Sequence, residues 1–188
     1  MNIQIMNKIK DTEISILGLL IDSPAHGYQI NKMIAGFSGI GVIWRINIAN
    51  LYAVLKRLEN EDYIQSEIFQ EKNRPARKMY TLTEQGRELF MHWISSPVKQ
   101  GRDFRILFLL KFYFALLQSS KNARELISAQ KKITNHWLEK IQVDGDKELD
   151  ESEFRPFIKK FRQTQIHAYQ EWLSWCEEAL KEKMRKNE

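Results

Sequence analysis

The fold is decided by residues 46–82, INIANLYAVLKRLENEDYIQSEIFQEKNRPARKMYTL. This stretch begins with apolar residues at the three- and four-residue spacing of an amphipathic helix. Asn47 stands before them, where its side-chain oxygen can cap the first free N–H groups. The apolar stripe consists of Ile48, Leu51, Val54, Leu55 and Leu58. The opposite side carries small, amide and cationic residues, namely Ala49, Asn50, Ala53, Lys56 and Arg57, with Tyr52 at the flank.

Two short strands and a basic turn follow this helix. Alternating apolar and polar residues predict one strand over residues 63–69, and residues 78–82 predict a second that pairs with it as a β-hairpin. The hairpin turn holds the one dense basic cluster of the sequence, Lys72, Arg74, Arg77 and Lys78, offset only by Glu71. Taken alone, the helix also fits an ordinary surface helix, and the cluster fits a solvated turn.

The residues before this stretch add two more helices. Apolar spacing predicts helices over residues 12–22 and 28–34, separated by the SPAHG turn, and a Gly-rich connection with a short strand over residues 42–44 follows. Thr83 is placed to cap a further helix after the hairpin. The order helix, helix, helix, strand, basic turn, strand is that of a winged helix-turn-helix domain. In that domain the third helix enters the DNA major groove and the hairpin, or wing, reaches the phosphates or the minor groove.

The open face of the third helix has the chemistry that DNA requires. Its two alanines keep the face low enough to seat deeply in a groove, and Asn50 can both donate to and accept from a base edge. Lys56 and Arg57 can pair with phosphates or guanine, and Tyr52 can donate its hydroxyl to a phosphate from the flank. The net charge of +5 and the pI near 9.2 agree with an anionic partner.

The second half of the chain predicts an all-helical domain. After a linker at residues 95–103, apolar spacing predicts helices over residues 104–118, 121–142 and 154–184. The first and last of these hold more apolar surface than one helical layer covers, which favours burial against a second copy in a homodimer. Three aromatic residues fit either core packing or a pocket for a small aromatic or apolar effector: Trp137, Tyr169 and Trp172.

Other function classes find no support in the sequence. The single cysteine, Cys176, excludes an intramolecular disulfide and a multi-cysteine zinc site, and it fits a reducing cytoplasm. No secretory signal is evident, and the apolar run at residues 104–117 is too short to cross a bilayer. The histidines lack metal-ligand spacing, and His26 is interpreted as a turn or helix-start residue. Because no catalytic or cofactor motif occurs, we expect no enzyme, metal, cofactor or membrane contact.

Three motifs within residues 12–92 resemble a known family. LGLLIDSPAHGYQINKMI, NLYAVLKRLENEDYI and NRPARKMYTLTEQGREL are similar in order and spacing to elements of the PadR family of bacterial transcriptional regulators. The helices after residue 100 resemble, more loosely, the longer AphA-like C-terminal domain of that family. The resemblance implies recognition-helix contacts from Asn50, Tyr52 and Lys56 and wing contacts from Arg74 and Arg77. Since Asn50 and Ala53 depart from the family's usual serine and proline, the operator sequence is expected to differ.

These observations predict a mainly α protein with a β-hairpin wing. A winged helix-turn-helix DNA-binding domain is expected at residues 1–98 and an all-α dimerisation domain at residues 103–188. The expected function is that of a cytoplasmic, homodimeric regulator of a palindromic operator in double-stranded DNA, a repressor more readily than an activator, with relief by an effector left open. The alternative is a protein-interaction adaptor whose winged helix binds no DNA. The candidate DNA-binding residues are Asn47, Asn50, Tyr52, Lys56, Arg57, Lys72, Arg74, Arg77 and Lys78.

Overall fold

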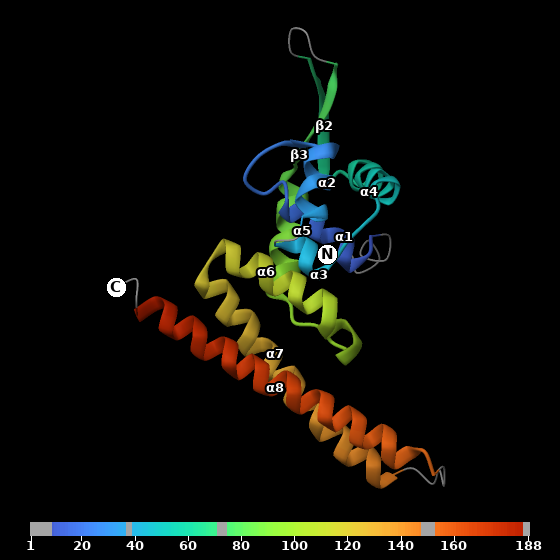
Figure 1. Cartoon of the computed structure of the whole chain (residues 1–188), viewed down its shortest axis with the longest axis vertical. Coiled ribbons are helices and arrows are strands. Elements are labelled where there is room, and N and C mark those ends of the chain that lie inside the picture. Colours follow the sequence, from blue (N-terminus) through green and yellow to red (C-terminus); the bar gives the residue numbers. More distant parts are fainter. Residues whose placement is uncertain (1–8, 37–38, 71–74, 148–152, 186–188) are drawn as a thin grey trace. The chain divides into compact units, whose positions relative to one another are not determined.

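The computed structural model divides into two compact units (Figure 1). The N-terminal unit contains the chain up to Ser95 together with Ile106–Phe114, and the C-terminal unit contains Ser96–Arg105 and the chain from Ala115 onward. The expected boundary near residue 100 therefore differs from the observed one, because residues 106–114 pack within the N-terminal unit. The structure describes residues 9–36, 39–70, 75–147 and 153–185.

The N-terminal unit has the element order of a winged helix-turn-helix domain (Figure 1). Its elements are α1 (Asp11–Gly18), β1 (Ala25–His26), α2 (Gly27–Ala35), α3 (Ile40–Ile43), α4 (Ile48–Asn60), β2 (Ile64–Phe69), β3 (Arg77–Leu82) and α5 (Glu84–Ser95). Helix α4 and the β2–β3 hairpin lie where the sequence predicts them, so the expected fold class is confirmed. Thr83 caps α5 as expected, because its hydroxyl oxygen accepts a hydrogen bond from the Gly86 N–H at 3.0 Å.

The three strands form one small antiparallel sheet in the order β1, β3, β2. In the hairpin, Ile64 pairs with Leu82 at the base and Phe69 with Arg77 farther out, so that the hairpin projects from the unit as the wing (Figure 1). The sequence predicts only a turn at β1, which pairs with the middle of β3. Two residues are too short a run to show the alternation that marks a strand.

The core of the N-terminal unit is built on the apolar stripe of α4. Leu51, Leu55 and Leu58 are completely buried, as the helical spacing predicts. Ile48 is the exception, since its side chain is 49% exposed. It is the first residue of α4 and lies almost one turn ahead of Leu51, the first buried residue, so the packed part of the helix begins after it.

Aromatic rings from α5 and α6 (Leu109–Gln118) close the other side of this core. Phe90 and Phe114 meet edge to face with their ring centroids 5.4 Å apart. A Cβ atom on Gly18 would lie 2.6 Å from an atom of each ring, so only glycine fits between them. Lys111, which interrupts the apolar run of α6, is buried and donates to the carbonyl oxygen of Trp93 at 2.7 Å. That bond offsets part of the cost of burying its ammonium group.

The Gly-rich connection between α2 and α4 folds as a helical turn, α3, and not as the expected strand at residues 42–44. Gly39 has a φ of +63°, which favours glycine. A Cβ atom on Gly41 would lie 2.0 Å from the carbonyl oxygen of Gly36. The two glycines therefore allow the connection to turn back closely onto the end of α2, a tertiary requirement that local propensity does not report.

Long helices dominate the rest of the chain. A 3₁₀ turn η2 (Gly101–Asp103) and a π-helical turn η3 (Phe104–Phe108) lead into α6, followed by α7 (Ser120–Lys147) and α8 (Arg155–Arg185). Helix α7 runs farther than the predicted end at residue 142. No helix within the described ranges is long and apolar enough to span a membrane.

In the C-terminal unit, α7 and α8 pack side by side along most of their length (Figure 1). The buried amide of Gln130 accepts from the Val98 N–H at 2.7 Å and donates to the Val98 carbonyl oxygen at 3.1 Å, which fixes the segment before η2 onto α7. Lys131 and Glu177 form an ion pair of 2.8 Å between α7 and α8. Three phenylalanines at the start of α8 stay largely exposed: Phe154, Phe157 and Phe161.

Candidate nucleic-acid interface

Helix α4 begins at a side-chain cap. The Asn47 side-chain oxygen accepts a hydrogen bond from the Asn50 N–H at 2.8 Å, as the sequence predicts. The Asn47 NH₂ and the second lone pair of its side-chain oxygen are then left for a partner outside the protein. We therefore interpret Asn47 first as the residue that fixes the start of α4 and only second as a DNA contact.

The open face of α4 is composed as the sequence predicts. Asn50 and Lys56 are exposed, as are the two alanines at positions 49 and 53. Tyr52 is 45% exposed at the flank, and its ring lies against the start of α2, since a Cβ atom on Gly27 would be 2.6 Å from a ring carbon. Gly27 therefore makes room for the Tyr52 ring, and this packing restricts where the tyrosine hydroxyl points.

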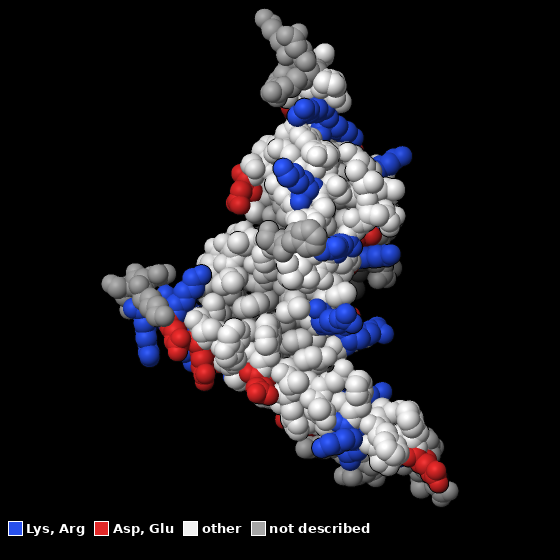
Figure 2. Space-filling model, viewed as in Figure 1, with Lys and Arg blue, Asp and Glu red and all other residues white. Residues whose placement is uncertain are grey.

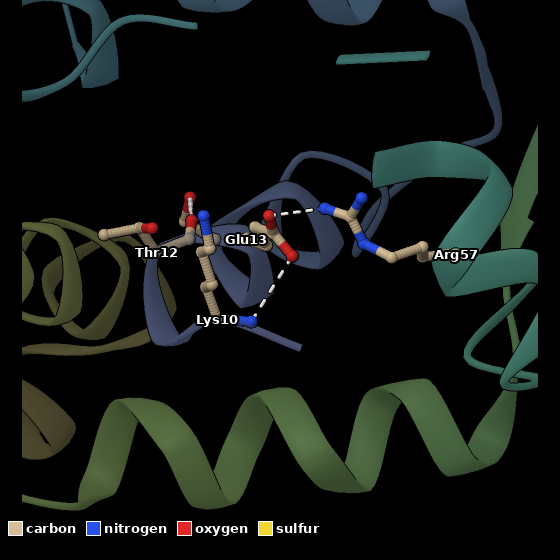
Figure 3. A network of polar contacts seen from close by, with 5 residues as sticks. Lys10, Thr12, Glu13 and Arg57 are labelled. Carbon is tan, nitrogen blue, oxygen red and sulfur yellow. Dashed lines mark hydrogen bonds and ion pairs between the residues drawn. The ribbon is translucent and has the colours of Figure 1, made fainter. Parts of the chain in front are cut away.

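Arg57 belongs to a different environment from its neighbour Lys56. Its guanidinium donates to the Glu13 carboxylate of α1 at 2.5 Å, as Figure 3 shows. Glu13 is buried and also accepts from the backbone N–H of Lys10 at 3.3 Å (Figure 3). The sequence places Arg57 on the open face by helical angle alone, but a long side chain at the edge of that face reaches a buried acid on α1. Its candidate role changes accordingly, from a DNA contact to a link between α1 and α4.

Glu59 ties the wing to α4. Its carboxylate accepts from Lys78 of β3 at 2.7 Å and from the hydroxyl of Ser66 of β2. The hydrogen bond from Lys78 is the main cause that lowers the pKa of Glu59, and the same bond raises the pKa of Lys78. Lys78 also lies over the Tyr80 ring, 5.3 Å from its centroid. Lys78 is therefore a paired cation, and Glu59 joins the candidate site as a residue that the sequence reasoning missed.

A pocket of about 520 Å³ lies between the start of α2, the flank of α4 and strand β3. An imidazole together with cationic and phenolic side chains lines it, and they come from segments far apart in the sequence: His26, Tyr28, Lys32, Tyr52, Arg77, Lys78 and Tyr80. Of the predicted DNA-binding residues, it brings together Tyr52, Arg77 and Lys78. Among the remaining lining residues, the sequence signals only His26 and Tyr28, through the HGYQ motif. The position of His26 beside Arg77 depends on the pairing of β1 with β3, which the sequence does not show.

The charge distribution agrees with an anionic partner for this unit. On the face drawn in Figure 2, Lys and Arg side chains lie at the base of the wing and at several separate places elsewhere in the view. The predicted wing contacts Lys72 and Arg74 lie outside the described residues. Within the described ranges, no three His, Cys, Asp or Glu side chains come together as a metal site would require.

The aromatic residues predicted to line an effector pocket are only partly brought together. Trp137 and Tyr169 line a pocket of about 500 Å³ in the C-terminal unit, together with cationic side chains from η2, α7 and α8. Trp137 donates to the Lys99 carbonyl oxygen at 3.1 Å, and the Tyr169 ring stacks on Phe104 at 4.1 Å. Trp172 does not line this pocket, because its ring packs edge to face on Phe104.

Comparison with known proteins agrees with this domain structure. The family described as Transcriptional regulator PadR-like family matches residues 16–92. Residues 16–92 are therefore a PadR-like domain. The match covers α2, α4, the wing and most of α5, including the Glu59–Lys78 contact. A PadR-like domain is that of a transcriptional regulator and not of an enzyme, in agreement with the sequence-based expectation.

The chain is also similar to characterised members beyond this PadR-like domain. It is 27% identical over 139 residues to the negative transcriptional regulator PadR of Bacillus subtilis, which covers 74% of this chain and 75% of that protein. The crystal structure of B. subtilis PadR in complex with operator DNA covers 88% of this chain and 97% of that chain, with 23% identity and a TM-score of 0.45. The structure of the same protein in complex with p-coumaric acid covers 91% and 96%, with 23% identity and a TM-score of 0.39.

Proposed function

We propose that this protein is a sequence-specific DNA-binding repressor that acts as a homodimer on a palindromic operator. The observation that carries the proposal is the open face of α4, where two small residues, an amide and a cation without an ion pair among the described residues stand next to a wing clamped to the same helix. Asn50 would read a base edge, and Lys56 would pair with a phosphate or a guanine. A regulator that works on DNA would act in the cytoplasm.

Repression is the direction that one relative favours. The B. subtilis relative is named a negative transcriptional regulator. Occupation of operator DNA by the α4 face and the wing would block access of RNA polymerase to the promoter. The wing residues Arg74 and Lys72 that the sequence predicts as contacts would add to the contacts of Arg77, and affinity would fall steeply with salt concentration because each phosphate contact releases a counterion.

Dimerisation through the C-terminal unit follows from its apolar surface. Phe154, Phe157 and Phe161 recur at helical spacing at the start of α8 and are each more than 60% exposed. Side chains of this size are buried in most soluble proteins, and a second copy of the same helix offers a matching apolar face. A two-fold dimer presents two copies of α4, which agrees with reading two half-sites of a palindrome.

Fluorescence anisotropy of a labelled duplex tests the proposal directly. The duplex carries the DNA upstream of the protein's own gene, and a scrambled duplex of equal composition is the control. Tight binding of two protomers to the first duplex alone, weakening between 50 and 200 mM salt, is the expected result. Absence of binding to either duplex at low salt would reject the DNA-binding function and favour the protein-interaction adaptor.

A second proposed role concerns the pocket that Trp137 and Tyr169 line. We propose that a small aromatic effector enters it and shifts the protein between states of different DNA affinity, which requires different affinity for the two states. Quenching of tryptophan fluorescence by candidate aromatic compounds would report binding. Retention of that quenching in the Trp137→Phe variant, together with an unchanged affinity, would place the effector elsewhere.

A further inference from the structure

The His26 ring is engaged on both of its nitrogen atoms, and the two contacts compete. Its Nδ1 accepts from the Gln29 backbone N–H at 3.2 Å and so caps α2, while the backbone N–H of His26 donates to the Gln29 side-chain oxygen at 3.1 Å. Its Nε2 lies 3.5 Å from a guanidinium nitrogen of Arg77. A neutral imidazole has one acceptor nitrogen and one N–H donor.

The cap decides which nitrogen carries the proton. Because Nδ1 accepts from the Gln29 N–H, the proton of the neutral ring lies on Nε2. The Nε2–H group then faces an N–H group of Arg77, and neither donor can satisfy the other. Two donors that converge at this distance are satisfied together by one acceptor placed between them, and an anionic oxygen is the strongest acceptor available.

The surroundings of this donor pair select for negative charge. Lys32 and Tyr28 line the same pocket, and Lys32 makes no ion pair within the described part of the chain. Lys78 also lines the pocket, with Glu59 as its partner. None of the residues that line the pocket is acidic. The pocket therefore presents the donor pair of His26 and Arg77, two lysines and an excess of positive charge to solvent.

The position of the pocket identifies the anion. Tyr52 of α4 forms one wall and strand β3 of the wing forms another, so the pocket lies between the two elements proposed to contact DNA. In a helix-turn-helix, the helix before the recognition helix crosses the DNA backbone, and here that helix is α2. A phosphate of the backbone would therefore come close to the mouth of this pocket when α4 enters the major groove.

We propose that the pocket between α2 and the wing binds one phosphate of the DNA backbone, which accepts hydrogen bonds from His26 Nε2–H and from Arg77. His26, which the sequence suggests is only a helix-start residue, is thus a DNA-binding residue. This inference rests on the proposed DNA-binding function and specifies one contact of it. A contact of this kind sets the register of the domain on the duplex and carries no base preference.

Three variants separate this contact from other effects. His26→Ser keeps a good helix cap but is too short to reach Arg77 or a phosphate held there. Arg77→Ala removes the cation, and Arg87→Gln removes one positive charge of the same unit outside the pocket. Thermal melts confirm that each variant is folded before its affinity is measured on the duplex that the wild-type chain binds most tightly.

The expected results differ between the variants. His26→Ser and Arg77→Ala each weaken binding about tenfold or more, as expected for a hydrogen bond to a charged group. Arg77→Ala also makes the negative slope of log K against log salt shallower, by about 0.9 per protomer. His26→Ser leaves the slope unchanged, because a neutral ring releases no counterion. Arg87→Gln stays within about twofold of the wild type, since it makes no such phosphate contact.

A scan of the duplex with neutral methylphosphonates, one position at a time, locates the phosphate. One position in each half-site should weaken binding of the wild type about tenfold and should weaken binding of His26→Ser and Arg77→Ala by a smaller factor, because each variant has lost one of the two donors to that phosphate. If the wild type binds DNA and no such position exists, or His26→Ser binds as tightly as the wild type, the inference is overturned while the proposed function stands. A shift of the His26 ring signals with inorganic phosphate, without any effect of His26→Ser on DNA affinity, would assign the pocket to a free anion and equally reject it.

Discussion

Replacement of Arg57 by alanine distinguishes a structural cation on α4 from a DNA-binding one. Arg57 donates to Glu13, whose carboxylate is buried and, among the described residues, keeps the Lys10 N–H bond of 3.3 Å alone when the guanidinium is removed. Loss of one partner of a fully buried ion pair costs about 3–5 kcal/mol, and a hydrogen bond to a charged group is worth about 1.5–3 kcal/mol. Because the Arg57 side chain is 44% exposed, solvent screens the pair and we expect a smaller loss than for a fully buried pair, about 1–2 kcal/mol.

Lys56→Ala is the matched control, since Lys56 is the adjacent cation on the same helix and is exposed without an ion pair in the described structure. Arg57→Ala should lower the melting temperature by roughly 2–8 °C and change DNA affinity at 20 °C by less than about twofold. Lys56→Ala should change the unfolding free energy by less than about 0.5 kcal/mol and weaken DNA binding about tenfold. Differential scanning calorimetry and anisotropy measure the two effects.

A double variant tests the cause of the instability. Arg57→Ala with Glu13→Gln should be more stable than Arg57→Ala alone, because no unpaired buried carboxylate is left. If Arg57→Ala has the melting temperature of the wild type and binds DNA as weakly as Lys56→Ala, the contact to α1 does not hold Arg57 in solution. Arg57 would then be the DNA contact that the helical angle suggests.

Three further results are expected. Glu59→Gln should speed amide hydrogen exchange in β2 and β3. Since Lys78 lowers the pKa of Glu59, the wild-type chain should lose the stabilisation from this contact, below about 1 kcal/mol, only as pH falls through that lowered pKa. Wild-type exchange rates that match those of the variant at neutral pH would argue against the clamp. Phe157→Ser combined with Phe161→Ser should convert a dimer into monomers in sedimentation velocity without loss of helical circular dichroism, and a dimer that persists would place the interface elsewhere. Burial raises the pKa of Cys176 to about 11, so its thiolate population at pH 8 is about 100-fold below that of a thiol with the reference pKa of 9.0. Disulfide-exchange labelling of Cys176 should therefore become fast only on unfolding. Rapid labelling of the folded chain would show that this thiol is accessible.

Sequence reasoning predicted the parts of the fold that local patterns encode. The buried face of α4, its Asn47 cap and the β2–β3 hairpin follow from spacing of 3.6 and 2 residues and from cap chemistry. Strand β1 and helix α3 were missed because each depends on a partner distant in the sequence, β3 in one case and the backbone at the end of α2 in the other.

The candidate site was predicted less completely than the fold. Helical angle places Lys56 and Arg57 on the same open face, and only the tertiary position of Glu13 separates their roles. In the same way, Lys78 belongs to the basic cluster by sequence, yet Glu59 pairs with it in the structure. Charge clusters in a sequence show which cations are available, but the acids that neutralise some of them come from other segments.

The clamp at Glu59 has a consequence for the DNA that this domain can read. Because one carboxylate bonds to both strands of the wing from α4, the helix and the hairpin approach a duplex together, with a fixed spacing between them. On the proposed function, a half-site is then selected by the distance from its major groove to the neighbouring backbone as well as by its bases. A sequence with matching bases but a groove of different width would have to bend to fit, and the energy of that bending would appear as specificity at base pairs the protein never touches.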